Sequence, residues 1–338
     1  MTAPLLVIDR VSKRFPLKAT LADKLAARLA GRRAGGAVHA VTDVSLTVAR
    51  GEVVGIVGES GCGKSTLGRI VSGIYAPTEG SITLDGQPVA KGREDHVNKL
   101  TTQVQMIHQD PFASLNPRMK VGETISEGPR THALVPSSEV GARTRALLQQ
   151  VGLEGAYADR LPHQFSGGQR QRIAIARALA MQPDLLVLDE AVASLDVSIQ
   201  AQVLNLFLDL RRDLGLTALF ISHDLSVVRH VCDRVAIMYL GRVVELAPAD
   251  ELYARPEHPY TKALFASVPT LGTGRRAFEP VQGEIPSPID PPPGCAFHPR
   301  CPFAGPRCRA EIPRLTAAGE GRSVACHLND GGVKAKAA

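Results

Sequence analysis

The chain has 338 residues, of which 44% are hydrophobic and 4% aromatic, and it contains no tryptophan. This length allows one large domain with a smaller appendage, built around a mostly aliphatic core. The formal charge is +6, but the arginines are scattered and no basic face with interleaved aromatic residues is visible, so we expect no DNA or RNA partner. A positive balance also suits a protein that lies against an anionic membrane surface.

Signals for membrane insertion or export are not visible in the sequence. No uninterrupted apolar run reaches about 18 residues, the length expected of a transmembrane helix. Residues 1–4 lack the basic-then-apolar order of a secretory signal. We therefore expect a cytosolic protein whose attachment to a membrane would come through partners.

The first sixty residues are rich in β-branched side chains. Short runs at 5–8, 38–48 and 52–57 are separated by turn residues and predict strands. Residues 16–36 differ, because leucines recur every four positions among basic side chains. This pattern predicts a basic amphipathic helix. We favour a surface helix packed on its own domain over one that lies on a membrane or on a membrane partner.

Apolar runs predict four buried parallel strands, at residues 53–57, 104–107, 185–188 and 218–221. Each run is followed closely by a residue with chemical potential, namely Gly58, Gln109, Asp189 and His223. Open α/β sheets bind their ligands beyond the carboxyl ends of the strands. We therefore expect an α/β fold in which these four segments meet at one crevice.

The remaining patterns suggest a domain division. Strand signals fade between residues 115 and 161, and 138–151 looks helical behind Ser137 or Ser138 as N-cap, so we expect an inserted helical subdomain at roughly 112–165. Residues 235–246 look like a strand, a turn and a strand. Beyond residue 250 a Pro-rich linker and a cysteine cluster follow. We expect a nucleotide-binding domain at 1–250 and a C-terminal extension at 251–338.

The segment after the first buried strand matches the P-loop pattern G-x-x-x-x-G-K-[ST] with Gly58, Glu59, Ser60, Gly61, Cys62, Gly63, Lys64, Ser65 and Thr66. Glycines let backbone N–H groups approach a phosphate, and the following helix adds the positive end of its dipole. We expect Lys64 to reach the β- and γ-phosphates, Ser65 to bind Mg²⁺ and Thr66 to contact the α-phosphate. We interpret Cys62 as a small residue that the loop tolerates, rather than as a reactive thiol activated by Lys64.

A second motif ends the buried run at 185–188 with two carboxylates. In a P-loop protein this pattern predicts that Asp189 holds Mg²⁺ through water and that Glu190 polarises the attacking water.

Residues Phe165, Ser166, Gly167, Gly168 and Gln169 complete a resemblance to the ATPases of ATP-binding cassette (ABC) proteins, which covers at least residues 5–250. The resemblance implies an ABC ATPase fold, with an antiparallel β subdomain and an inserted helical subdomain. It also implies that Ser166, Gly167, Gly168 and Gln169 cap the ATP held by a partner subunit. The chain would then hydrolyse ATP as half of a dimer.

The same resemblance assigns roles to single residues. Gln109 matches the glutamine that senses Mg²⁺ and the transmembrane partner, Asp196 lies in the loop that crosses the dimer interface, and His223 matches the histidine that contacts the γ-phosphate. Phe15 is a candidate to stack on adenine, the alternative being an ordinary core residue. Phe165 and Ala191 replace the family's more usual leucine and proline. Neither change removes a catalytic group, so we expect at least one competent hydrolysis site.

Three segments, at 109–119, 257–264 and 295–302, resemble the ATPases of oligopeptide, dipeptide and nickel importers. In such importers two ATPases, here expected to be paralogues, lie under two permeases at the cytoplasmic face of the bacterial inner membrane, and an extracytoplasmic solute-binding protein delivers the substrate. We favour peptides as the solute, with nickel or another small solute as the alternative. A soluble ABC ATPase that acts on DNA or the ribosome is disfavoured, because the chain has neither a long coiled coil nor a second cassette. A redox regulator centred on the cysteines is the remaining alternative.

Four of the six cysteines, Cys295, Cys301, Cys308 and Cys326, crowd into the C-terminal segment. In a reducing cytosol such clustering suggests metal rather than disulfides. Zinc ribbons favour paired C-x2–4-C knuckles, which are absent. The spacing resembles that of the 4Fe-4S site of peptide-importer ATPases, so we favour a 4Fe-4S cluster over Zn²⁺, and uncoordinated thiols come third.

Overall fold

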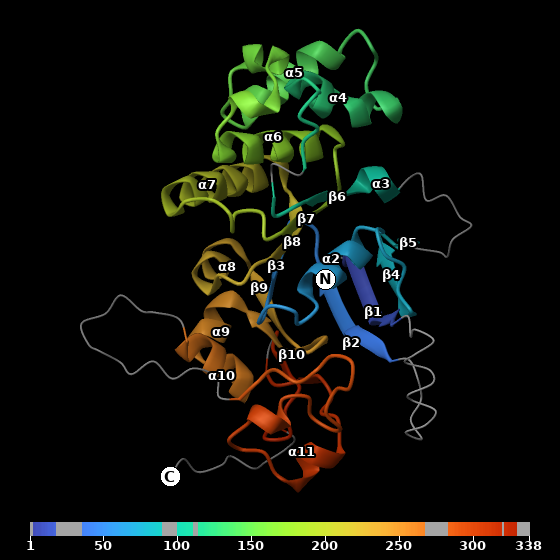
Figure 1. Ribbon diagram of the computed structural model, residues 1–338, viewed down its shortest axis with the longest axis vertical. Helices are drawn as coiled ribbons and strands as arrows, with labels where there is room; N and C mark the ends of the chain where they lie inside the picture. The colour runs from blue at the N-terminus through green and yellow to red at the C-terminus, as the bar shows by residue number, and fades with distance from the viewer. Residues whose placement is uncertain are drawn as a thin grey trace, which may run out of the picture.

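The computed structural model describes residues 3–17, 36–89, 100–110, 114–267, 283–319 and 321–329. The basic helix predicted at 16–36 lies almost entirely outside the described residues. Figure 1 shows three tiers along the longest axis, with a group of helices at one end, a large sheet in the middle and the C-terminal segment at the other end.

The middle tier is an eight-stranded sheet in the order β11-β12-β10-β9-β3-β8-β7-β6. Its strands are β3 (Val53–Val57), β6 (Val104–Ile107), β7 (Leu185–Asp189), β8 (Thr217–Ile221), β9 (Arg234–Tyr239), β10 (Arg242–Pro248), β11 (Thr316–Ala317) and β12 (Ser323–Val324). The strands from β9 to β6 are parallel, whereas β10, β12 and β11 pair antiparallel at one edge. The four predicted buried strands are confirmed as neighbours, and the C-terminal segment extends the same sheet.

Side-chain alternation along the strands divides the core into two clusters. In β3, Val53 and Val57 belong to one cluster, while Val54 and Ile56 belong to the other. A period of two places successive side chains on opposite faces of a sheet. Both faces are covered, so the strand is apolar at every position, as parallel strands usually are.

A four-stranded antiparallel sheet, in the order β2-β1-β4-β5, contributes to the second cluster. Its strands are β1 (Leu6–Pro16), β2 (Ala37–Val48), β4 (Glu79–Leu84) and β5 (Gln87–Pro88). Sequence analysis predicts β1 only in part and does not predict β4 or β5. The first three positions of β4 are exposed, and so its sequence lacks a clear alternation.

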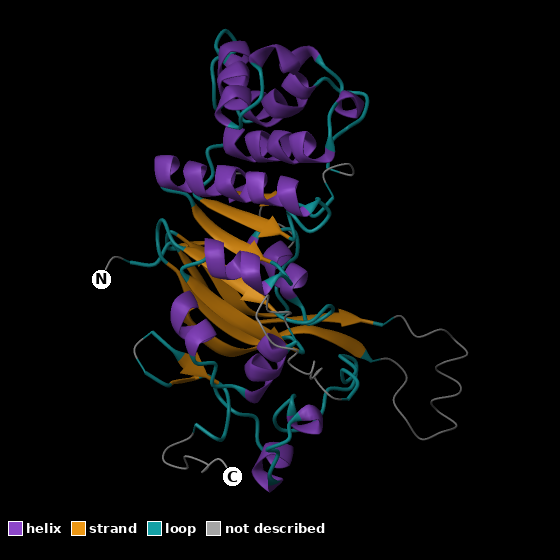
Figure 2. Cartoon of the chain, turned by 90° about the vertical axis from the view of Figure 1, so that its left-hand side faces the viewer, coloured by secondary structure: helices purple, strands orange, loops and turns teal. Residues whose placement is uncertain are grey.

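The helical end consists of α4 (Val121–Thr131), α5 (Val140–Gln150) and α6 (Gly167–Ala180). The cap of α5 is Glu139, without a side-chain hydrogen bond, and not Ser137 or Ser138 as predicted. The other helices are α2 (Lys64–Val71), α3 (Leu100–Gln103), α7 (Val197–Leu214), α8 (Leu225–Val231), α9 (Ala249–Ala254), α10 (Pro259–Ala266) and α11 (Pro306–Ala310). Figure 2 shows helices lying over the strands of the central tier. Within the described ranges, no helix has the length and apolar character needed to cross a membrane.

Candidate functional site

The predicted phosphate-binding loop joins β3 to α2. Gly61 and Gly63 have φ angles of +78° and +105°, a region that favours glycine. A Cβ atom at Gly63 would lie 2.0 Å from the Ala40 carbonyl oxygen, and one at Gly58 would lie 2.1 Å from the Met238 carbonyl oxygen. The glycines therefore let the loop pack closely against β2 and β9.

Lys64 is buried at the first position of α2, with 4% of its surface exposed. Its ammonium donates hydrogen bonds to the carbonyl oxygens of Gly58 at 2.7 Å and Glu59 at 3.0 Å. A buried charge must be paired or hydrogen-bonded, and here the loop itself supplies the acceptors. The cation is thus held against the loop, where the phosphates of ATP would compete for the same donors.

Of the three residues expected near Mg²⁺, which are Ser65, Gln109 and Asp189, the first and the last lie side by side. The Ser65 hydroxyl donates to Asp189 Oδ1 at 2.7 Å. Burial raises the pKa of the Asp189 carboxyl, and the hydrogen bond from Ser65 opposes that rise. Hydroxyl and carboxylate oxygens are the ligands that Mg²⁺ prefers, so the donor set fits this ion. Bound there, Mg²⁺ would neutralise charge on the phosphate oxygens.

Glu190 brings together the ends of three neighbouring strands. Gln109 Nε2, after β6, donates to Glu190 Oε2 at 3.0 Å. His223 Nδ1, after β8, lies 3.4 Å from Glu190 Oε1. The predicted convergence of these three residues is therefore visible in the geometry, while their roles stay predictions. A carboxylate held between an amide donor and an imidazole is well placed to orient a water molecule and accept its proton.

The predicted signature motif lies elsewhere. Ser166 caps α6, its hydroxyl accepts a hydrogen bond from the Gln169 N–H, and the Gln169 side chain accepts one from the Ser166 N–H. Gly167 faces Leu195, and a Cβ atom at Gly168 would lie 2.3 Å from Ile199 Cγ2. The motif therefore packs on the start of α7, and Figure 1 shows α6 and α7 well away from α2.

Asp196 is the N-cap residue of α7 and is exposed, without a side-chain capping bond. The next residue, Val197, has 83% of its surface exposed. This exposed apolar side chain lies directly beside Asp196, at the start of the helix on which the signature motif packs. These features form a surface that a second subunit could cover, as expected for Asp196.

Two further predicted residues have ordinary surroundings. Phe15 is half-buried at the end of β1, with its ring edge-to-face on Tyr75 at 5.5 Å between centroids and Lys13 Nζ 5.1 Å from its centroid. Its stacking on adenine stays a prediction. Cys62 is 6% exposed, and burial raises the pKa of its thiol. This agrees with a structural residue rather than a reactive one.

The four C-terminal cysteines line one small pocket, and none of them forms a disulfide. Burial, with a smaller contribution from the neighbouring thiols, raises the pKa of Cys295, and it raises that of Cys326 to about 11. Among the described residues, no three His, Cys, Asp or Glu side chains gather tightly enough to hold a single ion. The structure therefore does not show the metal site predicted for the four cysteines.

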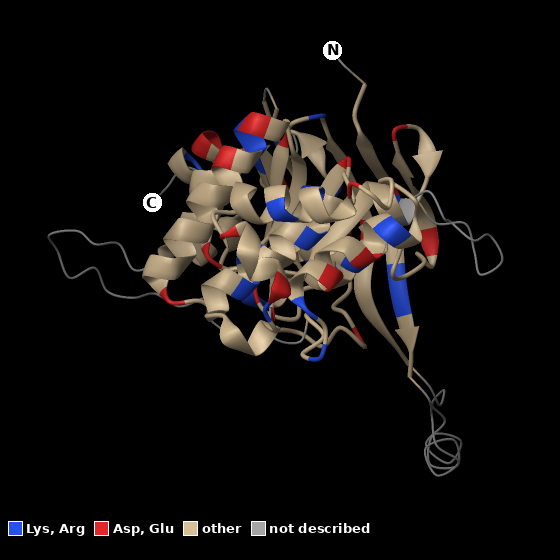
Figure 3. Ribbon diagram, turned by 90° about the horizontal axis from the view of Figure 1, so that it is seen from above, with Lys and Arg blue, Asp and Glu red and all other residues tan. Residues whose placement is uncertain are grey.

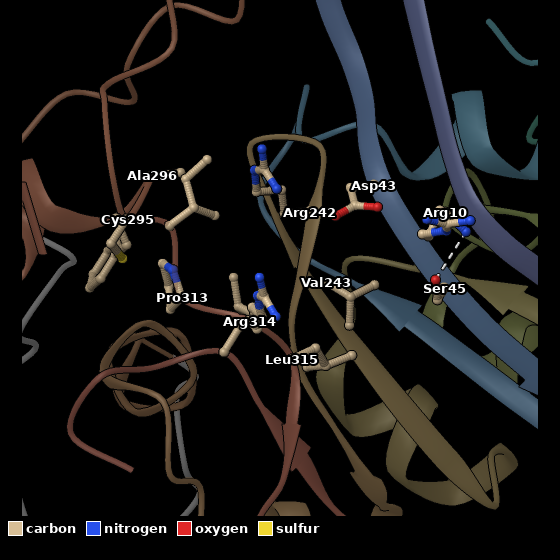
Figure 4. A pocket seen from close by; sticks show the side chains of 14 residues that line it. Arg10, Asp43, Ser45, Arg242, Val243, Cys295, Ala296, Pro313, Arg314 and Leu315 are labelled. Atoms are coloured by element: carbon tan, nitrogen blue, oxygen red, sulfur yellow. Dashed lines mark hydrogen bonds between the residues drawn. The ribbon is translucent and has the colours of Figure 1, made fainter. Parts of the chain in front are cut away.

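A hollow of about 560 Å³ lies away from the nucleotide residues. It opens between β1, β2, β10 and the C-terminal segment, where Arg10, Asp43, Arg242 and Arg314 border it (Figure 4). Of the predicted site residues, only Cys295 lines it. The carboxyl ends of β3, β6, β7 and β8 are instead followed by Gly58, Gln109, Glu190 and His223.

The phosphate-binding loop has two contacts that sequence analysis missed. The Glu59 N–H donates to the Tyr260 hydroxyl at 2.9 Å. Arg300 donates two hydrogen bonds to the Glu59 carboxylate, at 2.7 and 3.0 Å. Tyr260 and Arg300 lie in the segments that resemble peptide-importer ATPases, at 257–264 and 295–302. Each is more than 200 residues from Glu59 along the chain, so no local pattern indicated that they contact the loop.

Comparison with known proteins agrees with this geometry. Residues 41–193 match the family model "ABC transporter". An oligopeptide transport ATP-binding protein of Bacillus subtilis, AppF, is 48% identical over 96% of this chain and 97% of its own length. The chain belongs to the ABC transporter ATP-binding family. This ABC ATPase also matches the model "Oligopeptide/dipeptide transporter, C-terminal region" over residues 244–308.

Other relatives and solved structures extend the likeness. A probable peptide ABC transporter ATP-binding protein of Sinorhizobium fredii is 46% identical, covering 97% of this chain and 91% of its own length. The structure of CbiO1 from Clostridium perfringens, part of an ABC transporter complex, aligns with a TM-score of 0.62 and 29% identity over 75% of this chain and 91% of that one. The dimeric post-hydrolysis state of the cassette MJ0796, bound to ADP and phosphate, aligns with a TM-score of 0.61 and 26% identity over 72% and 98%. The ABC ATPase fold is thus confirmed, and ATP is the substrate of this chain.

Proposed function

We propose that this ABC ATPase hydrolyses ATP to drive import of oligopeptides or dipeptides. The observation that carries the proposal is the C-terminal region matched at 244–308, which follows an ABC core in the same chain. Relatives named for peptide, oligopeptide or di/tripeptide transport match 86–97% of the chain. Nickel or another small solute is the second candidate, since the same segments resemble nickel-importer ATPases.

The proposed assembly follows from the separation of the two halves of the ATP site. One chain presents Lys64 and Glu190, while its Ser166 lies on α6 and would cap ATP on a second, paralogous ATPase. Two permeases and an extracytoplasmic solute-binding protein complete the importer at the cytoplasmic face of the bacterial inner membrane. Figure 3 shows basic and acidic residues interspersed in the view from above.

The test is uptake by a strain that lacks this chain, complemented with the wild type or with Glu190→Gln. We expect uptake of labelled di- and oligopeptides to be restored only by the wild type, while uptake of nickel is unaffected by the deletion. A defect in nickel uptake with normal peptide uptake would overturn the choice of solute. Normal uptake of both would overturn the transport role.

We also propose the division into residues 1–250 and 251–338, and a 4Fe-4S cluster on the four cysteines of the extension. A shared pocket lined by all four cysteines supports one group held by all four. Zn²⁺ is the alternative.

The test of the cluster is an assay of iron, sulfide and zinc after anaerobic purification. About four irons in the wild type and in Cys232→Ser, lost in Cys301→Ser, support the cluster; one zinc, or no metal, contradicts it.

A further inference from the structure

Glu59 in the phosphate-binding loop is held from outside the ABC core. We propose that Arg300 and Tyr260 are positioning residues for ATP binding, through which the C-terminal extension fixes the conformation and charge of this loop. The inference goes beyond the transported solute, since it concerns ATP binding by this chain alone.

Arg300 and Glu59 form a fork-to-fork pair. Arg300 Nη1 and Nη2 donate to the two carboxylate oxygens of Glu59, with side chains that are 4% and 22% exposed, respectively. Two parallel charge-assisted bonds fix orientation as well as distance.

A buried aromatic cluster anchors Tyr260 and Arg300, the two residues that contact Glu59. Tyr239 of β9, Tyr260 of α10 and Phe297 of the extension are at most 2% exposed, and their ring centroids lie 4.7–5.4 Å apart. The Arg300 guanidinium also lies 5.8 Å from the Tyr239 ring centroid. A packed aromatic cluster holds few alternative rotamers. The packing of this aromatic cluster therefore fixes where the Tyr260 hydroxyl and the Arg300 guanidinium meet the loop.

The Glu59 residue is consequently held at three points. Tyr260 accepts its N–H, Lys64 donates to its carbonyl oxygen, and Arg300 binds its carboxylate. When Lys64 turns to the phosphates, the two contacts from the extension still hold the loop. Arg300 also neutralises a carboxylate that would otherwise repel the triphosphate across a short distance.

The test measures the dissociation constant of Mg-ATP for the full chain. Arg300→Met is expected to raise this constant about tenfold, which corresponds to about 1.4 kcal/mol. Tyr260→Phe and Arg300→Lys, which preserve packing or charge, are expected to raise it by smaller factors. A matched control is Arg322→Met, because Arg322 is a second buried arginine of the extension, 3% exposed, that contacts Glu245, Glu251 and Glu257 instead of the loop.

Both Arg→Met variants are expected to lower the melting temperature, but only Arg300→Met is expected to weaken ATP binding. Equal weakening in both, or an unchanged dissociation constant in Arg300→Met, would overturn the proposal. The double variant Glu59→Gln/Arg300→Met is expected to lose no more affinity than Arg300→Met alone, because both changes remove one interaction. A larger loss would show that the two residues act independently. Binding of ATP is the readout, so a failure of peptide transport leaves the result unaffected.

Discussion

Glu190 illustrates how a single residue is adapted to chemistry. Its φ angle is +50°, a left-handed conformation that few residues other than glycine adopt. The turn bends the chain sharply after β7, and the Glu190 N–H is secured by the Ile221 carbonyl oxygen at 2.9 Å. Backbone strain of this kind persists where surrounding contacts over-determine it. Here those contacts aim the carboxylate at Gln109 and His223.

Glu190→Gln is expected to lower the ATP turnover rate by at least about 100-fold, because an amide of the same shape cannot accept a proton from water. Its affinity for Mg-ATP should stay within about twofold of the wild type, since the phosphate contacts of Lys64 and Ser65 are unchanged. Phosphate release and equilibrium binding measure the two quantities. Unchanged turnover would refute the role of Glu190 as the catalytic carboxylate.

His258 couples stability to pH at the start of α10. It is 1% exposed, and its Nδ1 accepts the Tyr260 N–H at 3.0 Å. Burial lowers its pKa from 6.5 to about 3. Between these values only the unfolded chain binds the proton, so the free energy of unfolding falls as pH falls through this window, while above pH 6.5 this group has no effect.

His258→Asn keeps an N-cap acceptor but cannot titrate. Between pH 7 and pH 5 the wild type should lose about 2 kcal/mol more of its unfolding free energy than the variant does. Urea unfolding at the two pH values measures this difference. Equal losses in the two proteins would show that His258 is already charged in the folded state or that it is solvated there.

At the scale of elements, the contact between α6 and α7 depends on a glycine. A side chain at Gly168 would meet Ile199 at 2.3 Å, closer than any real contact allows. The glycine lets the start of the signature helix lie directly on α7, so the Ser166 cap and the Asp196 loop are held side by side. Packing of these two helices therefore also determines the geometry of the predicted dimer surface.

Gly168→Ala is expected to lower the free energy of unfolding by about 1–3 kcal/mol through overpacking. In an Ile199→Ala background, which removes the obstructing methyl group, the same change should be neutral or stabilising, because alanine is the better helix former. Thermal unfolding of the four proteins measures the coupling. A Gly168→Ala cost that is independent of residue 199 would contradict this account of the packing.

At the scale of the whole molecule, the two parts of the proposed ATP site lie far apart in one chain. The phosphate-binding loop lies at the carboxyl ends of the central strands, whereas Ser166 and Asp196 lie on the outer helices (Figure 1). The described contacts of Ser166 are with its own helix. We therefore propose that a second subunit brings these surfaces together for ATP hydrolysis.

Ser166→Arg is expected to leave the affinity of the isolated chain for Mg-ATP within about twofold, because this chain's own loop is untouched. In the assembled transporter the same change should reduce ATP turnover at least about tenfold, since a bulky cation would separate the two subunits at the capped site. Loss of affinity in the isolated chain to the same degree would indicate that Ser166 acts on the ATP of its own subunit.

The sequence by itself determined the parts whose signals are local. A buried apolar strand, a glycine-rich loop and a helix follow one another within twenty residues, so Lys64 and Ser65 could be predicted from spacing. Asp189 could be predicted from a second apolar run that ends in two carboxylates. The meeting of the segments that follow the four buried strands was predicted from a general rule for α/β sheets, whereas the order of those strands was not predicted. The cap at Ser166 was likewise local, whereas the N-cap of α5 is Glu139 and has no capping side-chain bond that a sequence pattern could signal.

Only the tertiary structure decided the contacts between distant segments. No local sequence pattern relates the residues that meet in these contacts. They are the pairing of β12 with β10, the close packing of Gly168 on Ile199, and the hydrogen bonds of Tyr260 and Arg300 with Glu59. Such contacts depend on how the whole core packs. A buried charge such as that of Arg300 is stable only where the fold places a carboxylate beside it. The sequence names the residues predicted to contact ATP, and the folded core determines which side chains hold them in place.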